Sequence, residues 1–338
     1  MTKRWKRRPD GSTWGDFGDS DQLGRLNLLT REKVLQGIAE VQEGVIFSLS
    51  LPLDLPGGNV LNPSRNPPLL EANVRDGTPV FLHEFTREYN TTDVACDDRV
   101  TMSLQYSTQW DSLAHIGSRF DADDDGIAEI VFYNGYRSTD FLHPNDSLDG
   151  SSCAIRLGIE NMATHGVQGR GVMIDARHHH GDCRQSLGYD QLLRICDLDG
   201  AEISPGDMLC VHTGFADLVL TMGGKPDAKR LAESCSVLDG HDPLLLKWID
   251  QTGISVLIAD NYAVEERPYE FQGDGKRPLL PLHEHCLFKL GVHLGELWYL
   301  TDLAEWLRIH GRSRFMLTAP PLRLPGAVGS PVNPIATV

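Results

Sequence analysis

The stretch Gln105-Tyr106-Ser107-Thr108-Gln109-Trp110-Asp111-Ser112-Leu113-Ala114-His115-Ile116-Gly117 places side chains that bind metals or transfer protons close together in the chain. Apolar residues alternate with polar ones in the segment that leads into it, which predicts a strand over residues 100–109. Alternate residues of an extended chain share one face, so Gln109 and Asp111 are expected to point the same way. If the chain bends after Asp111, the imidazole of His115 meets its carboxylate over one small site.

This stretch resembles the signature of the cyclase / bacterial kynurenine formamidase superfamily, which reads His-x-Gly-Thr-His-x-Asp-x-Pro-x-His. Thr108, Asp111 and His115 match that signature. Gln105 and Gln109 stand where the family has two histidine metal ligands, and two further signature positions also differ. An amide oxygen is a weaker, uncharged donor than an imidazole nitrogen, so these two glutamines are expected to weaken a metal site.

Four other segments extend the resemblance over most of the chain. Residues 281–285 (Pro-Leu-His-Glu-His) and 290–296 (Leu-Gly-Val-His-Leu-Gly-Glu) are similar to the family segments whose histidine and glutamate complete the metal site. Residues 14–16 and 21–30 resemble the opening of a long subgroup of the family. The joint pattern, rather than any one segment, carries the resemblance.

The resemblance implies that Asp111, His283 and Glu296 bind a divalent metal and that Gln109 is a weaker ligand. His285 competes with His283, because a small shift in the alignment would exchange them. The implied cofactor is Mn²⁺ or Zn²⁺, and the exchange of imidazole for amide oxygen shifts the preference from zinc toward manganese or magnesium. A metal held in this way lowers the pKa of its bound water and polarises a carbonyl group.

The resemblance also implies a hydrolase that cleaves an amide, a cyclic amide or a lactone with metal-activated water. His115 occupies the family position of the general acid/base, a role that suits an imidazole. Trp14, Trp110 and Tyr262 are candidates for substrate contacts, and the substrate is a small molecule with a carbonyl group. Two alternatives stay open: a non-catalytic small-molecule-binding protein with a degenerate metal site, and a metal-dependent lyase or dehydratase that uses His115 for proton abstraction.

The implied fold is α/β, a swivelling β/β/α arrangement with a mixed central β-sheet flanked by helices. We expect residues 1–338 to form one such domain, with an N-terminal arm at 1–30 and a Pro- and Gly-rich C-terminal tail at 320–338 that wraps a neighbour or trails. Residues 52–78 are rich in Pro, Gly and Asn and are predicted to be a loop. A loop of this length is usually functional or partner-binding, so we expect a homodimer or homotetramer.

Caps and apolar periodicity predict the regular elements. Thr30 is a candidate N-cap for a helix that continues to about Gln42. Further helices are expected over 151–165, 189–196, 242–251 and 283–290, and strands over 45–51, 171–175, 207–214, 254–259, 292–298 and 314–319. His178, His179 and His180 follow a predicted strand, but three adjacent side chains cannot all face one ion.

Composition excludes several classes of protein. The formal net charge of −16 repels phosphate backbones, so a nucleic-acid partner is not expected. No apolar run approaches the length of a membrane-spanning helix. The seven cysteines are scattered and form no C-x-x-C pair, which favours reduced thiols in a cytoplasmic protein.

Overall fold

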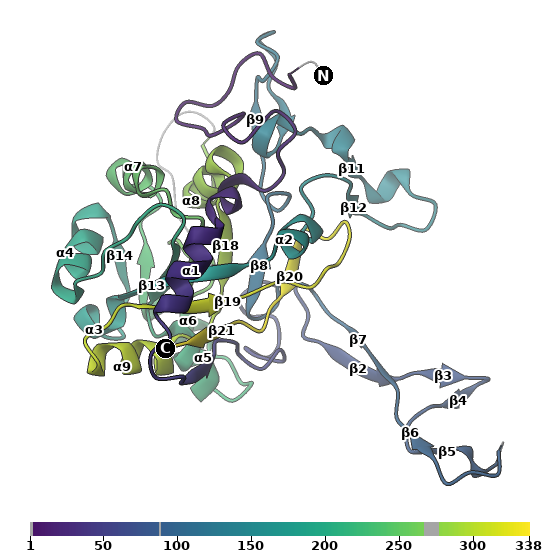
Figure 1. Cartoon of the computed structure of the whole chain (residues 1–338). Helices are drawn as coiled ribbons and strands as arrows, with labels where there is room; N and C mark the ends of the chain where they lie inside the picture. Colours follow the sequence, from purple (N-terminus) through teal and green to yellow (C-terminus); the bar gives the residue numbers. More distant parts are fainter. Residues whose placement is uncertain (1–2, 88, 267–276) are drawn as a thin grey trace.

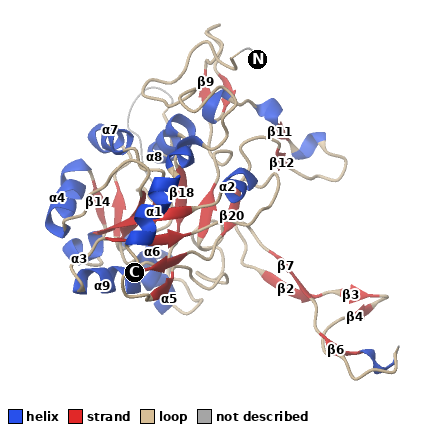
Figure 2. Cartoon of the chain, in the orientation of Figure 1, coloured by secondary structure: helices blue, strands red, loops and turns tan. Residues whose placement is uncertain are grey.

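The computed structural model of this chain describes residues 3–87, 89–266 and 277–338. Within these residues the centre is a nine-stranded mixed sheet with helices on both faces (Figures 1 and 2). From edge to edge its strands are β1 (Ile46–Ser48), β21 (Ile335–Thr337), β19 (Arg314–Thr318), β13 (Gln168–Asp175), β15 (Met208–His212), β17 (Val256–Ala259), β18 (His293–Glu296), β8 (Gln109–Asp111) and β20 (Gly329–Pro331). This architecture confirms the predicted fold class.

The four strands β13, β15, β17 and β18 run parallel at the middle of the sheet. Their residues are almost entirely buried and most are apolar, as expected for strands that are covered on both faces. β8 lies antiparallel to β18, and β19 lies antiparallel to β13. The antiparallel strand β8 therefore brings the motif residues against the last parallel strand.

Helices pack on both faces of this sheet. Alternate strand residues such as Val172 and Ile174 belong to the core cluster on one face, which includes side chains from residues 189–199, 243–252 and 284–290, whereas Met173 belongs to the cluster on the other face, with side chains from residues 160–165 and 301–309. The helices are α1 (Arg31–Ala39), α2 (Glu160–His165), α3 (Ala176–His180), α4 (Tyr189–Asp199), α5 (Phe215–Thr221), α6 (Ala228–Glu233), α7 (Pro243–Thr252), α8 (Pro281–His283) and α9 (Thr301–Ile309). A π-helix, η6 (Glu284–Leu290), continues directly from α8. Short 3₁₀ helices are η1 (Gly24–Leu28), η2 (Phe85–Arg87), η3 (Tyr133–Gly135), η4 (Ser138–Asp140) and η5 (Pro144–Asp146).

Local capping accounts for the helices that the sequence predicted well. The Thr30 side chain accepts a hydrogen bond from the Lys33 backbone nitrogen and caps α1 as predicted. Asp242 likewise accepts from the Leu244 backbone nitrogen and begins α7. Gly253 and Gly291 take left-handed conformations that end α7 and η6.

Other segments differ from the prediction. The predicted tail at 320–338 supplies β20 and β21 of the central sheet, so it neither trails nor leaves the domain. The predicted strand over 100–109 is interrupted, because the chain turns after residue 101 and pairs again only at β8. The predicted helix over 151–165 is shorter, because the short strand β12 precedes α2.

Residues 69–101 form an arm of short hairpins that projects from the body of the molecule (Figure 1). Part of the predicted 52–78 loop is therefore strand. The hairpin pairs are β2 (Leu69–Ala72) with β7 (Asp98–Thr101), β3 (Val74–Arg75) with β4 (Thr78–Pro79), and β5 (His83–Glu84) with β6 (Val94–Ala95). The remaining pairs in the body are β9 (Ser118–Phe120) with β10 (Glu129–Val131), β11 (Phe141–Leu142) with β12 (Cys153–Ala154), and β14 (Gln185–Leu187) with β16 (Ser236–Leu238).

No helix in the described part of the chain is long and apolar enough to cross a bilayer.

Candidate functional site

Two carboxylates reach one face of the sheet from the neighbouring strands β8 and β18. The register pairs Gln109 with Glu296, and Asp111 lies two residues further along β8 on the same face. Asp111 and Glu296 are therefore diagonal neighbours, a spacing at which side chains of paired strands interact. The strand alternation predicted for Gln109 and Asp111 is confirmed.

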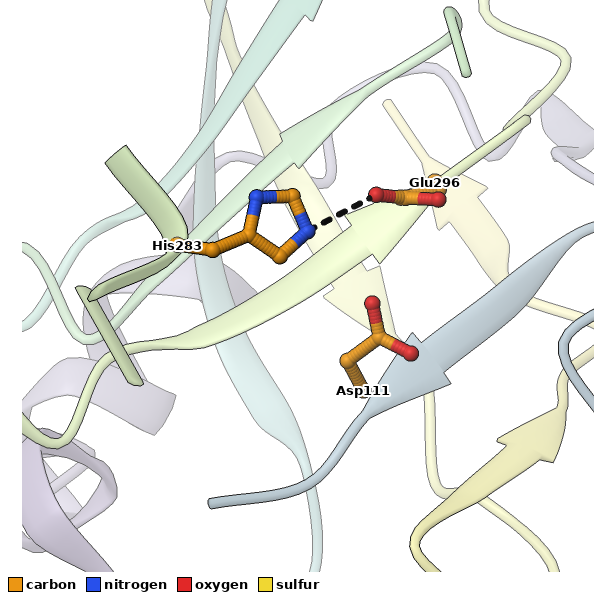
Figure 3. A group of neighbouring side chains, drawn as sticks. All are labelled: Asp111, His283 and Glu296. Atoms are coloured by element: carbon orange, nitrogen blue, oxygen red, sulfur yellow. Dashed lines mark ion pairs between the residues drawn. The ribbon is translucent and has the colours of Figure 1, made fainter. Parts of the chain in front are cut away.

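His283 joins these carboxylates from the junction of α8 and η6. Its Nε2 atom lies 3.2 Å from Oε1 of Glu296 (Figure 3). One ligand atom from each of Asp111, His283 and Glu296 lies within 4.8 Å of the others, and all three side chains are buried. His285 lies outside this group, although it is only two residues away. The π-helical turn after His283 is a form of helix that frequently occurs at functional sites.

The protein leaves two polar atoms of this site unsatisfied. Oδ2 of Asp111 and Oε1 of Gln109 are buried and have no hydrogen-bond partner among the described residues. A buried oxygen without a partner destabilises the fold, and a cation between the carboxylates would remove that cost for Asp111. Carboxylate and imidazole donors suit zinc or manganese. The residues present therefore fit a divalent metal.

Gln109, the weaker of the predicted ligands, lies between the two carboxylates of the site. Its amide nitrogen donates to Oε2 of Glu296 at 3.1 Å and to Oδ1 of Asp111 at 3.4 Å. In this orientation the amide nitrogen of Gln109 bridges the two carboxylates, and its amide oxygen has no hydrogen-bond partner among the described residues. Ligation through that oxygen requires the amide group to rotate by half a turn.

Charges at the site influence one another strongly. Burial raises the pKa of the Asp111 carboxyl group. Burial acts in the same direction on Glu296, but its hydrogen bond with His283 and the charges of His283, Arg65 and His115 together outweigh burial and lower the pKa of Glu296. Burial alone would lower the pKa of His283, yet hydrogen bonds with Glu265 and Glu296 raise it to about 10. The site is therefore arranged to hold positive charge among its carboxylates.

Glu265 was missed in the sequence, although it contacts a predicted ligand. It follows β17, and its carboxylate accepts a hydrogen bond from Nδ1 of His283 at 2.7 Å. The available signal was its place in the segment that follows the carboxyl end of a parallel strand, where α/β sheets position ligand-binding groups.

His115 lies beside the metal-ligand group, at the end of the bend that was predicted after Asp111. Its backbone nitrogen donates to Ser112 and closes a turn, and its Nε2 atom lies 3.9 Å from Oδ1 of Asp111. Its Nδ1 atom lies 3.4 Å from the amide nitrogen of Gln105. The His115 side chain is 19% exposed, so solvent and small molecules have access to it while the three ligand candidates are buried.

A narrow pocket opens beside Gln105. Arg65 donates to the Gln105 carbonyl oxygen at 2.8 Å, and its guanidinium carbon lies 5.8 Å from the centre of the Tyr262 ring. Asn62 donates to the Tyr262 hydroxyl group at 3.2 Å. Tyr262 thus lines a pocket next to the residues that contact His115. Arg65 was missed because it lies in the long predicted loop, where the spacing of residues says nothing about their position.

The structure does not bring the two predicted tryptophans to this site. The Trp14 and Trp110 side chains are buried in hydrophobic cores on opposite faces of the sheet. Their indole nitrogens donate to the backbone carbonyls of Phe288 and Ala319 at 2.7 and 2.8 Å. Trp110 lies between Gln109 and Asp111 in β8, so the strand alternation turns it away from them.

The His178–His180 run also lies away from the metal-ligand group. These residues form most of α3, which follows β13 at a distance of three strands from β18. His179 pairs with Asp199 at 2.7 Å. Nothing in this arrangement gives the run a metal-binding role.

A family model described as "Putative cyclase" matches residues 47–266. The crystal structure of a novel cyclase is similar over 97% of this chain and 99% of that chain, with 29% identity and a TM-score of 0.75. Isatin hydrolase A from Labrenzia aggregata, bound to benzyl benzoate, has 13% identity and a TM-score of 0.55 over 90% of this chain and 97% of its own. Isatin hydrolase A from Ralstonia solanacearum has 14% identity and a TM-score of 0.53 over 86% of this chain and 91% of its own. These two enzymes share the fold, and no curated protein matches the sequence.

Proposed function

Because this chain belongs to the cyclase family, we propose that it is a metal-dependent hydrolase that cleaves an amide, a cyclic amide or a lactone. One observation carries the proposal. Three buried ligand groups converge within 4.8 Å, and an accessible imidazole lies beside them. That arrangement supplies a metal site and a proton-transfer group in one place.

Asp111, His283 and Glu296 would hold the metal, which we propose to be manganese or zinc. When bound, a divalent metal supplies water of lowered pKa and polarises a substrate carbonyl group. The protein contributes the exclusion of bulk water, since all three ligand side chains are buried. Gln109 keeps the two carboxylates in place through its amide nitrogen.

His115 is the proposed general acid/base. Replacing it with alanine should lower kcat by about 10²–10⁴-fold, because a positioned proton-transfer group contributes that much. Metal content should stay unchanged, because His115 is outside the ligand group. Steady-state kinetics and elemental analysis of the same preparation measure both quantities. A His115→Ala variant with the parent's kcat would remove this residue from the mechanism.

The proposed substrate is a small molecule with a carbonyl group that approaches His115 from the side of Gln105, where the pocket of this structure measures only about 10 Å³ and would have to widen to admit it. Tyr262 offers an aromatic face and a hydroxyl group there, and Arg65 offers a cation. Each is a suitable partner for a planar, polar carbonyl compound. Amides, imides and lactones are therefore the compounds to screen first.

A non-catalytic binding protein is the second candidate. At the position where the family signature has a metal-binding histidine, this chain has Gln109, whose amide nitrogen donates to both carboxylates of the site. Metal content distinguishes the two functions. If the parent holds no metal and Gln109→His gains it, the site has lost its chemistry and the binding-protein function is preferred. For an active parent, incorporation of oxygen from labelled water distinguishes hydrolysis from the lyase reaction.

We also propose a homo-oligomer that is formed through the arm at 69–101. A hairpin alone is marginally stable in water, and this arm exposes large apolar side chains by more than half of their surface. These are Leu69, Leu70, Val74, Phe81, Leu82, Tyr89, Val94 and Val100. The arm holds seven acidic and three basic residues, whereas residues 3–8 hold five basic ones, so a second copy offers complementary charge.

The oligomer proposal predicts that Leu70→Glu combined with Leu82→Glu lowers the molar mass in solution. Each substitution places a charge on the apolar surface that the partner would cover. Light scattering after size-exclusion chromatography measures the change. A parent that is already monomeric at micromolar concentration would contradict the proposal.

A further inference from the structure

We propose that Glu265 is a positioning residue that aims His283 at the metal and strengthens this remaining imidazole ligand. The inference rests on the proposed metal site and deepens it. Neither the sequence signature nor the comparisons with other proteins assign a role to Glu265.

One carboxylate fixes both the ring of His283 and the backbone that carries it. Oε1 of Glu265 accepts from Nδ1 of His283 at 2.7 Å and from the His283 backbone nitrogen at 2.9 Å. Oε2 accepts from the backbone nitrogen of Leu282 at 2.9 Å. The side chains of Glu265 and His283 are 1% and 3% exposed, so water does not compete for these bonds. With Nδ1 donating to Glu265, Nε2 faces the carboxylates of the site and is the nitrogen that would give up its proton to bind a metal.

The chain reaches this carboxylate through a strained turn. Ala263 and Val264 have φ angles of 75° and 57°, in the left-handed region that β-branched residues avoid. The turn is held to β16 by backbone hydrogen bonds in which Leu238 donates to Val264 at 3.1 Å and Glu266 donates to Leu238 at 3.0 Å. Strain of this kind costs free energy and persists where the surrounding structure imposes it, often at functional sites. The strained turn comes directly before Glu265, which supports a functional need for this orientation of the Glu265 carboxylate.

The ligand set explains why such a residue matters in this chain. The metal-ligand group holds one imidazole and two carboxylates, and glutamines stand at two positions where the family signature has histidines. A carboxylate that accepts from the far nitrogen of a histidine ligand fixes its tautomer and raises its donor strength. Glu265 therefore compensates in part for the missing imidazoles.

Two independent variants disturb this contact. Glu265→Gln keeps the shape of the side chain and removes its charge. Gly240→Ala removes no polar group, but its new Cβ atom would overlap Oε2 of Glu265 and displace the carboxylate, while it would lie 3.1 Å from the Leu282 backbone nitrogen. Glu284→Gln is the matched control, because this carboxylate lies on the same helical segment and contacts Ser118 and Lys289 instead of the ligands.

The measurements are the dissociation constant for Mn²⁺ or Zn²⁺, from competition with a chromophoric chelator, and the visible spectrum of the Co²⁺-substituted protein. We expect Glu265→Gln and Gly240→Ala to bind metal about 10–100-fold more weakly than the parent, with a changed Co²⁺ spectrum. Glu284→Gln should match the parent. If Glu265→Gln does not fold, Gly240→Ala decides the question.

Unchanged affinity and an unchanged Co²⁺ spectrum in both variants would overturn the inference. Loss of thermal stability without loss of affinity would also overturn it, because Glu265 would then only cap the backbone of α8. A parent that binds no metal would instead overturn the proposed function. The two failures are therefore distinguishable in one set of titrations.

Discussion

Replacing Asp111 with alanine is expected to abolish bound metal and activity together. kcat/KM should fall by at least about a thousandfold, because a bound metal contributes several kcal/mol of transition-state stabilisation. Asp111 is fully buried in the ligand group, and one of its oxygens has no hydrogen-bond partner in the part of the chain that the structure describes. Elemental analysis and steady-state kinetics on the same preparation measure both losses.

The variant Asp111→Asn separates loss of chemistry from loss of folding. Burial raises the pKa of Asp111, so the ionised carboxylate destabilises the metal-free fold. The metal-free Asn variant should therefore unfold at the same temperature as the metal-free parent or at a higher one, while it binds little metal. Parental metal content and activity in either variant would show that Asp111 is not a ligand.

The largest loss of stability is expected for Asp207→Ala. Asp207 is completely buried and accepts from Nζ of Lys33 at 2.8 Å and from Nε of Arg170 at 2.9 Å. These contacts tie α1 to β13 and to the segment before β15. Removing the carboxylate leaves two cations, only 8% and 12% exposed, without this counter-charge. The free energy of unfolding should fall by about 3–5 kcal/mol, measured by urea denaturation.

An exposed ion pair provides the control for Asp207. Arg99 and Glu71 lie 3.2 Å apart, with side chains that are 60% and 41% exposed. Glu71→Ala should therefore cost about 1 kcal/mol or less. If Asp207→Ala and Glu71→Ala lower the free energy of unfolding equally, the buried ion pairs of Asp207 do not stabilise the fold more than an exposed pair does.

The contribution of Asp207 should depend on pH. Burial opposes its ionisation, but hydrogen bonds from Arg170 and Lys33 outweigh burial and lower its pKa below the ordinary value of 3.8. A group whose pKa is lower in the folded state stabilises the fold above its unfolded pKa, and this stabilisation is lost as pH falls through the folded value. The stability difference between the parent and Asp207→Ala should therefore shrink on acidification below about pH 4. A difference that grows in acid would contradict this sign.

The sequence was informative where structure depends on neighbours in the chain. The caps at Thr30 and Asp242 form hydrogen bonds with residues two or three positions away, so the starts of their helices were predictable. The apolar run at 171–175 lies in the buried strand β13. The alternation around Asp111 also predicted which side chains of β8 share a face.

The features that the sequence did not predict depend on contacts between residues that are distant in the sequence. β20 and β21 have three residues each, and pairing with β8 and β19 rather than their own composition makes them strands. The tryptophan residues were misplaced because a large aromatic side chain beside a motif fills the core as readily as it contacts substrate. Glu265 meets His283 only because a turn with unusual backbone angles brings it there.

The central claim is that Asp111, His283 and Glu296 bind one divalent metal. Equilibrium dialysis of metal-stripped protein against Mn²⁺ or Zn²⁺, followed by plasma mass spectrometry, tests it directly when Asp111→Ala is dialysed in parallel. The account predicts about one ion per chain for the parent and almost none for the variant. A parent without stoichiometric metal, or a variant that binds as much as the parent, would contradict it.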